Sequence, residues 1–336
     1  MSVGIATVFD GSINYICAMP LWCASASELS RVIPDSRVVI FGQHKSEDCP
    51  NAQYIWGKVG EDTYDAAKRY LNRTQVSGGW AYLKMSALLK VGVLALDQFK
   101  LILYADMDSD LQPLGPHHPT PFNEKEWTQS IDAFMKSKAR FVGSPDHSTP
   151  VNTGVWLYKP HAQIYRDALD VLRHGSWNAA QGFNEAGDAH SLGMDPKQLQ
   201  RLAVGRVNWD KDEASARSQI WPASFKMNHT QFMKENTWFF VGGNIDQGLF
   251  WYVIYVKHGL GTWTYDHSTW RIHHFWGPGK PWSFFQEGNA RVNYIQRLEQ
   301  WGRMAAAPDT RCKRYLESQW HRALKRNLTA KDDSPG

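Results

Sequence analysis

The 336-residue chain lacks the features that mark several specialised classes of protein. It has no apolar run long enough to span a membrane, and no basic segment precedes its apolar residues 3–9. We therefore expect neither a transmembrane helix nor a signal peptide, and a cytoplasmic location. Its four cysteines show no Cys-x-x-Cys spacing and no dense framework. Free thiols are the expected state, and a disulfide bridge is the alternative.

A strong charge of one sign is also absent. The formal net charge is +4, from 37 Lys and Arg against 33 Asp and Glu, and both signs are mixed along the chain. This balance is too mild to predict nucleic-acid binding, although it suits a phosphate-bearing substrate. No internal repeat occurs, and the length fits one large α/β domain or two smaller ones.

What the chain does contain is an alternation of short apolar segments with segments of helical spacing. This alternation predicts a sheet of βαβ units with helices packed against it. We expect strands at residues 3–9, 37–42, 101–105, 140–144 and 155–158, and helices from the turn at 10–12 to about residue 30 and over 80–99. The polar segment 161–235 predicts a helical insertion, and the basic segment 291–336 predicts a helical tail with a disordered end.

The predicted strand 101–105 runs directly into acidic residues at Asp106, Asp108 and Asp110. Ligands of open α/β sheets bind beyond the carboxyl ends of strands, where Asp106 and Asp108 are expected. Two neighbouring carboxylates repel one another unless a positive group lies between them, so a divalent cation with a phosphate-bearing substrate is a natural occupant. An ordinary acidic turn explains the same residues without a metal, and it is the expected role of Asp110.

Three further segments carry residues that can bind ligands. The loop 272–282 combines His274 with Gly277 and Lys280, which supply an imidazole, a close backbone approach and a cation for phosphate. The other two segments are the turns at 152–154 and 242–248. Taken singly, each of the three also fits ordinary turn chemistry.

Taken in order, these segments resemble the family 8 glycosyltransferases, the glycogenin-like group. The resemblance spans roughly residues 3 to 282, and its most specific element is the His-x-x-Gly-x-x-Lys-Pro-Trp ending. The matching segments are Tyr-Ala-Asp106-Met-Asp108, Phe-Val-Gly-Ser-Pro145-Asp146, Val-Asn152-Thr-Gly154-Val, Asp246-Gln247-Gly248 and His274-Phe-Trp-Gly277-Pro-Gly-Lys280-Pro-Trp282. The resemblance implies a GT-A fold, a Rossmann-like mixed α/β sheet flanked by helices, in a domain over residues 1–290.

The resemblance also implies roles for individual residues. Asp106, Asp108 and His274 would ligate Mn²⁺, with Mg²⁺ as a substitute, on the diphosphate of a UDP-sugar. Residues implied in donor binding are Thr7, Val8, Tyr15, Lys84, Asp106, Met107, Asp108, Asn152, Gly154, Gly277 and Lys280. Asp246 and Gln247 would lie near the anomeric carbon, where Asp246 would stabilise the cationic centre or act as the nucleophile of a retaining transfer.

The sequence departs from the family pattern in three places. Met107 stands where a small residue is usual, Thr153 replaces the common Ser or Ala, and the segment 161–235 is longer than in compact members. That segment is expected on the acceptor side, so the acceptor is not inherited from any relative. The alternatives are a UDP-sugar-binding or carbohydrate-binding protein without activity and a sugar-nucleotide pyrophosphorylase. The latter usually carries a glycine-rich loop, which residues 1–40 lack. A homodimer is left open.

Overall fold

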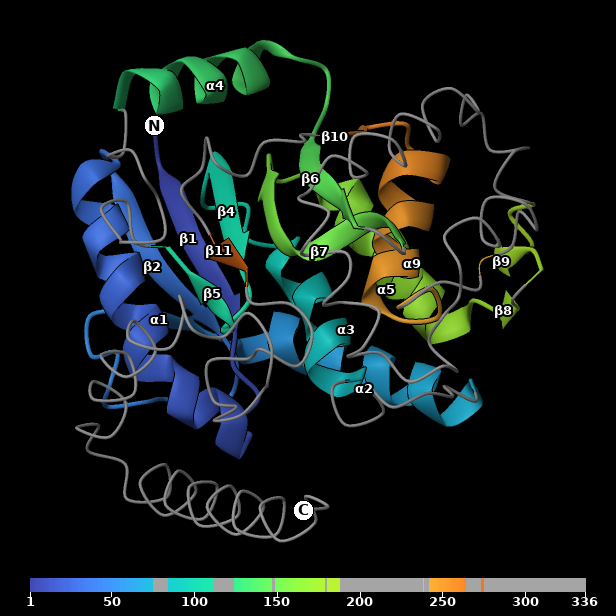
Figure 1. Cartoon of the computed structure of the whole chain (residues 1–336). Coiled ribbons are helices and arrows are strands. Elements are labelled where there is room, and N and C mark those ends of the chain that lie inside the picture. Colours follow the sequence, from blue (N-terminus) through green and yellow to red (C-terminus); the bar gives the residue numbers. More distant parts are fainter. Residues whose placement is uncertain are drawn as a thin grey trace, which may run out of the picture.

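The computed structural model describes residues 1–74, 84–111, 124–146, 149–178, 180–187, 238, 242–263 and 273–274. Seven strands form one mixed sheet in the order β10-β6-β7-β4-β1-β2-β3 (Figure 1). Their bounds are β1 Val3–Val8, β2 Ser36–Phe41, β3 Gln53–Ile55, β4 Leu101–Ala105, β6 Phe141–Asp146, β7 Thr149–Tyr158 and β10 Gly261–Trp263. Two small sheets pair β5 (Ser109–Asp110) with β11 (His273–His274) and β8 (Trp177–Asn178) with β9 (Gly182–Phe183).

Helices cover both faces of the large sheet. They are α1 Ile13–Val32, α2 Gly57–Arg73, α3 Lys84–Val93, α4 Glu124–Lys136, α5 Ala162–His174 and α9 Asp246–Phe250, and α9 continues into the π-helix η3, Trp251–Lys257. One apolar core joins the sheet to α2, α3, α5, α9 and η3. A second core on the opposite face joins it to α1 and α4. The structure thus confirms the predicted α/β fold with a mixed sheet flanked by helices.

The strand directions place several carboxyl ends at one edge of the sheet. Strands β1, β2, β3 and β4 are parallel, while β7 runs antiparallel to β4 and to β6. Every residue of β1 and of β4 is buried, as expected for strands covered on both faces. The predicted buried parallel strand at 101–105 is therefore confirmed, and the residue that follows it, Asp106, lies at the carboxyl edge.

The strongly apolar strands were predictable, whereas α2 and α4 were not. The buried face of α2 consists mostly of the small or polar residues Gly60, Thr63, Ala66 and Ala67, rather than the large apolar residues by which the other elements were identified. Asp110 was expected in a turn, but it lies in β5 and pairs with His273. This expectation was wrong because the antiparallel partner comes from a distant segment that local sequence does not reveal.

The expectation of free thiols is also wrong for two cysteines. Cys23 in α1 and Cys49 in the loop between β2 and β3 form a disulfide, with their Cα atoms 5.6 Å apart. Local sequence gave no signal for this pairing, because it depends on the packing of α1 against β2 and on the path of the following loop. The side chains of the other two cysteines lie outside the described part of the chain.

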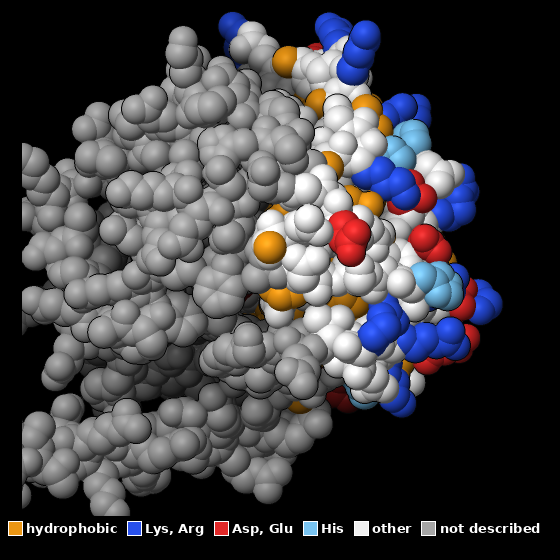
Figure 2. Space-filling model, turned by 90° about the vertical axis from the view of Figure 1, so that its right-hand side faces the viewer, with side chains coloured by type: hydrophobic (Ala, Val, Ile, Leu, Met, Phe, Trp, Pro, Cys, Tyr) orange, Lys and Arg blue, Asp and Glu red, His pale blue; other side chains and the backbone are white. Residues whose placement is uncertain are grey.

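Some expectations concern segments that the structure does not describe. The boundary at residue 290, the tail after it and most of the insertion 161–235 lie there. The described start of that segment, α5, packs its apolar side chains into the same core as α2. None of the helices among the described residues is long and apolar enough to cross a membrane. On the described part of the face in Figure 2, Lys and Arg side chains lie interspersed with Asp and Glu.

Candidate functional site

A buried lysine joins two acidic residues at the carboxyl edge of the sheet. The ammonium of Lys90, in α3, lies 2.9 Å from Oδ2 of Asp106 and 2.9 Å from Oδ2 of Asp246. Asp106 follows β4 directly, and Asp246 begins α9. The three side chains are 8%, 15% and 6% exposed. The fold therefore gathers a helix, a strand end and a helix start around one ion-pair cluster.

The charges of this cluster depend on one another. Burial alone would lower the pKa of the Lys90 ammonium, but the carboxylates of Asp106 and Asp246 outweigh that effect and raise the pKa above its ordinary value. Lys90 is therefore charged throughout the neutral range. A buried charge is costly unless it is paired and hydrogen-bonded, and here both conditions are met.

Thr153 in β7 completes the hydrogen bonds of the cluster. Its hydroxyl donates to Oδ2 of Asp246 at 2.6 Å, and its carbonyl accepts from the Lys90 ammonium at 3.2 Å. The same carbonyl accepts from the indole N–H of Trp156 at 3.1 Å. Thr153 is 1% exposed, so these bonds form away from solvent. They fix the direction in which the Asp246 carboxylate points.

The second oxygen of Asp106 is held from the preceding strand. The hydroxyl of Tyr104 donates to Oδ1 of Asp106 at 2.5 Å, and the Tyr104 ring stacks on Trp156 with centroids 4.5 Å apart. Burial, together with the Asp106 carboxylate, raises the pKa of Tyr104 well above its ordinary value. The hydroxyl therefore stays protonated and can donate at any pH at which the protein works.

Asp108 and Tyr15 extend the site toward α1. The Asp108 side chain is buried, with 6% of the residue exposed. Burial raises the pKa of the Tyr15 hydroxyl well above its ordinary value, and the carboxylates of Asp106 and Asp108 raise it further. A hydrogen bond with Ser86, in α3, acts in the opposite direction. The Tyr15 hydroxyl is therefore a neutral group close to both predicted metal-binding aspartates.

A tight turn sets the position of Asp246. Gly242 has a φ of 72°, which favours glycine, and its carbonyl accepts from the backbone N–H of Gly248 at 2.9 Å. A Cβ on Gly248 would lie 1.7 Å from the carbonyl oxygen of Gly243. The hydroxyl of Tyr70, in α2, donates to the carbonyl of Asn244 at 2.7 Å and ties the turn to the core. The glycines of this turn therefore serve close backbone contacts.

The predicted third metal ligand lies next to the acidic segment in the fold. In the small β5–β11 sheet, His274 pairs with Ser109, the residue after Asp108. The side chain of His274 lies outside the described residues. Among the side chains that the structure does describe, no three His, Cys, Asp or Glu form a group that could hold a metal ion. The backbone pairing thus brings the three predicted ligands into neighbouring positions.

Three buried oxygens near this edge have no hydrogen-bond partner among the described residues. They are Oγ1 of Thr7 at the end of β1, Oγ of Ser109 in β5 and Oε1 of Gln247 in α9. Buried polar atoms in folded proteins are nearly always hydrogen-bonded. Such atoms are suitable partners for a polar ligand.

The remaining predicted site residues pack in the cores, make local backbone contacts or lie outside the described residues. Val8 and Met107 are buried in the two apolar cores, so their side chains pack rather than face a ligand. Residues 152–154 were expected in a turn but lie within β7, where Oδ1 of Asn152 accepts from the backbone N–H of Gly154 at 2.7 Å. The side chain of Lys84, at the start of α3, is outside the described residues, as are the predicted phosphate-binding residues Gly277 and Lys280.

Sequence reasoning missed three members of the site, namely Lys90, Thr153 in its hydrogen-bonding role, and Tyr104. Lys84 was expected to face the donor phosphates, which nothing in the described residues tests, and no role was expected for Lys90, which contacts both carboxylates. One signal was present in the sequence. Lys90 interrupts the apolar run 87–93, and a lysine in such a run is rarely buried unless it is paired.

No protein-family model matches the chain, and no curated protein sequence matches it. Solved structures of similar shape include the galactosyltransferase LgtC with donor and acceptor sugar analogues, at 13% identity over 91% of this chain and 98% of that one, with a TM-score of 0.41. The glycosyltransferase GlyE of Streptococcus pneumoniae is 10% identical over 96% of this chain and 64% of that one, with a TM-score of 0.38. These likenesses are too loose to assign the chain to a family.

Proposed function

We propose that the chain is a retaining glycosyltransferase that moves a hexose or related sugar from a UDP-sugar to an acceptor, with Mn²⁺ bound at the donor diphosphate. The observation that carries the proposal is the buried cluster of Lys90, Asp106 and Asp246 at the carboxyl edge of the sheet, with Asp108 beside it. The proposal is supported by the sequence, because Asp106, Asp108 and Asp246 belong to the motifs that resemble family 8 glycosyltransferases.

The residues present fit a divalent cation. The carboxylates of Asp106 and Asp108 offer hard oxygen donors, and the β5–β11 pairing places His274 opposite Ser109, the residue after Asp108. Oxygen donors with one imidazole suit Mn²⁺, and carboxylates with water suit Mg²⁺. A cation bound there would offset the negative charge that grows on the departing UDP.

The chain's own residues would hold the reacting groups in place. Lys90 keeps the Asp106 and Asp246 carboxylates paired and fixed, and the Thr153 hydroxyl orients Asp246. An ionised Asp246 near the anomeric carbon would stabilise the oxocarbenium-like centre that develops as the sugar–phosphate bond breaks. Tyr104 and Lys90 hold one oxygen each of Asp106, so that carboxylate needs no reorganisation when the donor arrives.

The proposal is tested by a panel of UDP-sugars, scored for UDP release with Mn²⁺ and with a chelator. We expect release from at least one donor, loss of release with the chelator, and a fall of at least about 100-fold in Asp108→Asn. Asp170→Asn, on the exposed side of α5, is the matched control and should retain full activity. Full activity in metal-free buffer would remove the metal from the proposal. Tight UDP binding without turnover of any donor would favour an inactive binding protein.

A further inference from the structure

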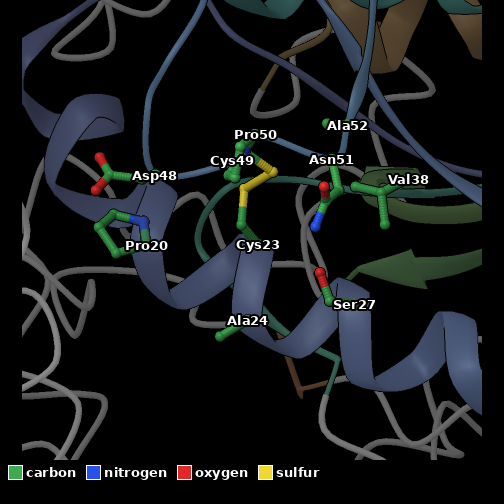
Figure 3. Close-up of a pocket in the computed structure, with 10 residues that line it drawn as sticks. All are labelled: Pro20, Cys23, Ala24, Ser27, Val38, Asp48, Cys49, Pro50, Asn51 and Ala52. Carbon is green, nitrogen blue, oxygen red and sulfur yellow. A yellow bond between two sulfur atoms is a disulfide. The ribbon is translucent and has the colours of Figure 1, made fainter.

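A pocket of about 180 Å³ opens beside the disulfide, on the α1 side of the sheet (Figure 3). One wall is formed by Pro20, Ala24 and Ser27 of α1, and the other by Val38 of β2 and residues 48–52 of the following loop. Cys23 and Cys49 both line the pocket, and Figure 3 shows their bond crossing from the helix to the loop. The disulfide is therefore part of the pocket surface.

The pocket gives the sulfur atoms a selective access route. Cys23 is 3% exposed and Cys49 is 4% exposed, so little of either side chain is open to a large reagent. A volume of about 180 Å³ holds a molecule of a few heavy atoms and excludes a folded protein. A small thiolate that enters the pocket can meet the disulfide directly, and access is one of the conditions for thiol–disulfide exchange.

Among the described residues that line the pocket, one other than the two cysteines carries an ionisable side chain. The carboxylate of Asp48 belongs to the loop wall, and its Oδ2 accepts a hydrogen bond from the hydroxyl of Ser46 at 3.2 Å. The other lining residues are apolar or neutral: Pro20, Ala24, Ser27, Val38, Pro50, Asn51 and Ala52. A fixed negative charge on one wall repels an anionic molecule and attracts a cationic one.

We propose that Cys23–Cys49 is a site of thiol–disulfide exchange with small thiols that carry a cationic group, which enter through this pocket and are selected by Asp48. In the exchange, the incoming thiolate attacks one Sγ and forms a new S–S bond with it. The Cys23–Cys49 bond breaks, and the other cysteine leaves as a thiolate that takes a proton from water. The product is a mixed disulfide, with no net oxidation or reduction.

Exchange at this bond could affect the predicted donor site, because α1 carries residues of both. Tyr15, whose hydroxyl lies near Asp106 and Asp108, is in the same helix about two turns before Cys23. Breaking the disulfide would release the loop 42–52 from α1. This loop follows β2, and the carbonyl of Phe41, the last residue of β2, accepts a hydrogen bond from the backbone N–H of Phe9. Modification of Cys23 or Cys49 would therefore remove a covalent link between α1 and this loop, close to the proposed site, without changing a residue of that site.

The experiment compares two small thiols of opposite charge, cysteamine and thioglycolate, on the full-length native protein. Intact mass and peptide mapping follow mixed disulfides at Cys23 and Cys49, and rates are normalised to thiolate concentration. The ratio of the cysteamine rate to the thioglycolate rate should fall about fivefold in Asp48→Asn relative to the wild type, at low salt. Comparing ratios between variants cancels the intrinsic reactivities of the two thiols.

Two controls separate the pocket from other effects. Ser27→Leu places a larger side chain in the pocket and should slow exchange with both thiols by at least about tenfold. Cys23→Ala/Cys49→Ala should yield no adduct on the peptides of the disulfide. The proposal is overturned if exchange occurs only in denaturant, if Asp48→Asn leaves the ratio unchanged, if Ser27→Leu reacts as fast as the wild type, or if mass analysis finds both thiols free beforehand. The outcome is independent of sugar transfer.

Discussion

The ammonium of Lys90 and the carboxylate of Asp246 lie 2.9 Å apart, although they come from helices that are distant in sequence. Both side chains are more than nine-tenths buried. Removal of one partner from such a pair leaves an uncompensated charge, whereas the intact pair stabilises little more than a well-packed apolar pair would. The contact is therefore better explained by positioning than by stability. It holds Asp246 where three elements meet.

The first prediction concerns the charge of Lys90. Lys90→Met removes the cation and leaves two facing carboxylates, so we expect the free energy of unfolding at pH 7 to fall by about 3–5 kcal/mol. Lowering the pH toward 5 should restore part of that loss, because protonation of one carboxylate relieves the repulsion. Urea unfolding at several pH values measures both effects.

Lys90→Arg is the matched variant, because it keeps the charge and changes the geometry. We expect it to retain most of the stability, while donor turnover falls about 100-fold through misplacement of Asp246. A Lys90→Met protein as stable as the wild type at pH 7 would contradict the ion-pair account. An active Lys90→Arg protein would show that the charge is sufficient without the lysine geometry.

The second prediction concerns Tyr104 and alkaline pH. The pKa of Tyr104 is raised in the folded protein, so above about pH 10 the unfolded chain loses a proton that the folded chain keeps. Stability is therefore present below that pH and is lost as the pH rises through it. Tyr104→Phe should remove up to about 1.4 kcal/mol per pH unit from this loss between roughly pH 10 and 11. Urea midpoints from pH 8 to 11 measure the slope.

Tyr64 provides the control for this measurement, because it is 39% exposed. Tyr64→Phe should keep the pH dependence of the wild type. An identical slope in Tyr104→Phe would mean that the hydroxyl of Tyr104 is not held protonated by its burial beside Asp106.

The third prediction concerns the turn before α9. Gly248→Ala places a Cβ 1.7 Å from the Gly243 carbonyl oxygen, so the backbone must shift. We expect a loss of about 3 kcal/mol in the free energy of unfolding, and reduced donor turnover because Asp246 moves with the turn. Gly57→Ala is the control that separates a steric clash from backbone strain. Its Cβ would meet nothing within 4 Å, but the φ of 50° is unfavourable for alanine. It should cost about 1 kcal/mol. Equal costs for the two variants would contradict the contact argument.

The sequence predicted the parts of the fold whose signal is local. Strands β1 and β4 are buried on both faces, so they read as continuous apolar runs, and the acidic residues after β4 mark where the strand ends. The expectation that Asp106 and Asp246 belong to one site came only from the family resemblance. Their common contact with Lys90 depends on the packing of α3 against α9, and no local pattern records that packing.

Other parts of the site escaped prediction for related reasons. In the sequence Thr153 belongs to a short polar segment that suggested a turn, and its hydrogen bond to Asp246 becomes visible only when β7 and α9 are adjacent. Lys90 had no expected role, because its two carboxylate partners come from β4 and α9, which lie far from it in sequence. The Cys23–Cys49 bond likewise required the path of the loop after β2.

The last prediction concerns the stability that this disulfide provides. The bond closes a loop with a sequence separation of 26, for which the loss of unfolded-state entropy predicts a stabilisation of about 3 kcal/mol. Cys23→Ala/Cys49→Ala should lower the free energy of unfolding by at least that amount, and a reductant should destabilise the wild type but not the double variant. Because both cysteines pack in the core of α1 and β2, the alanines also remove buried volume, so the single variants are needed. Each single variant should cost less than the double variant, because it removes the bond but only one of the two buried side chains. A wild type whose unfolding does not change on full reduction would contradict the prediction, because the bond would then constrain nothing in the unfolded chain.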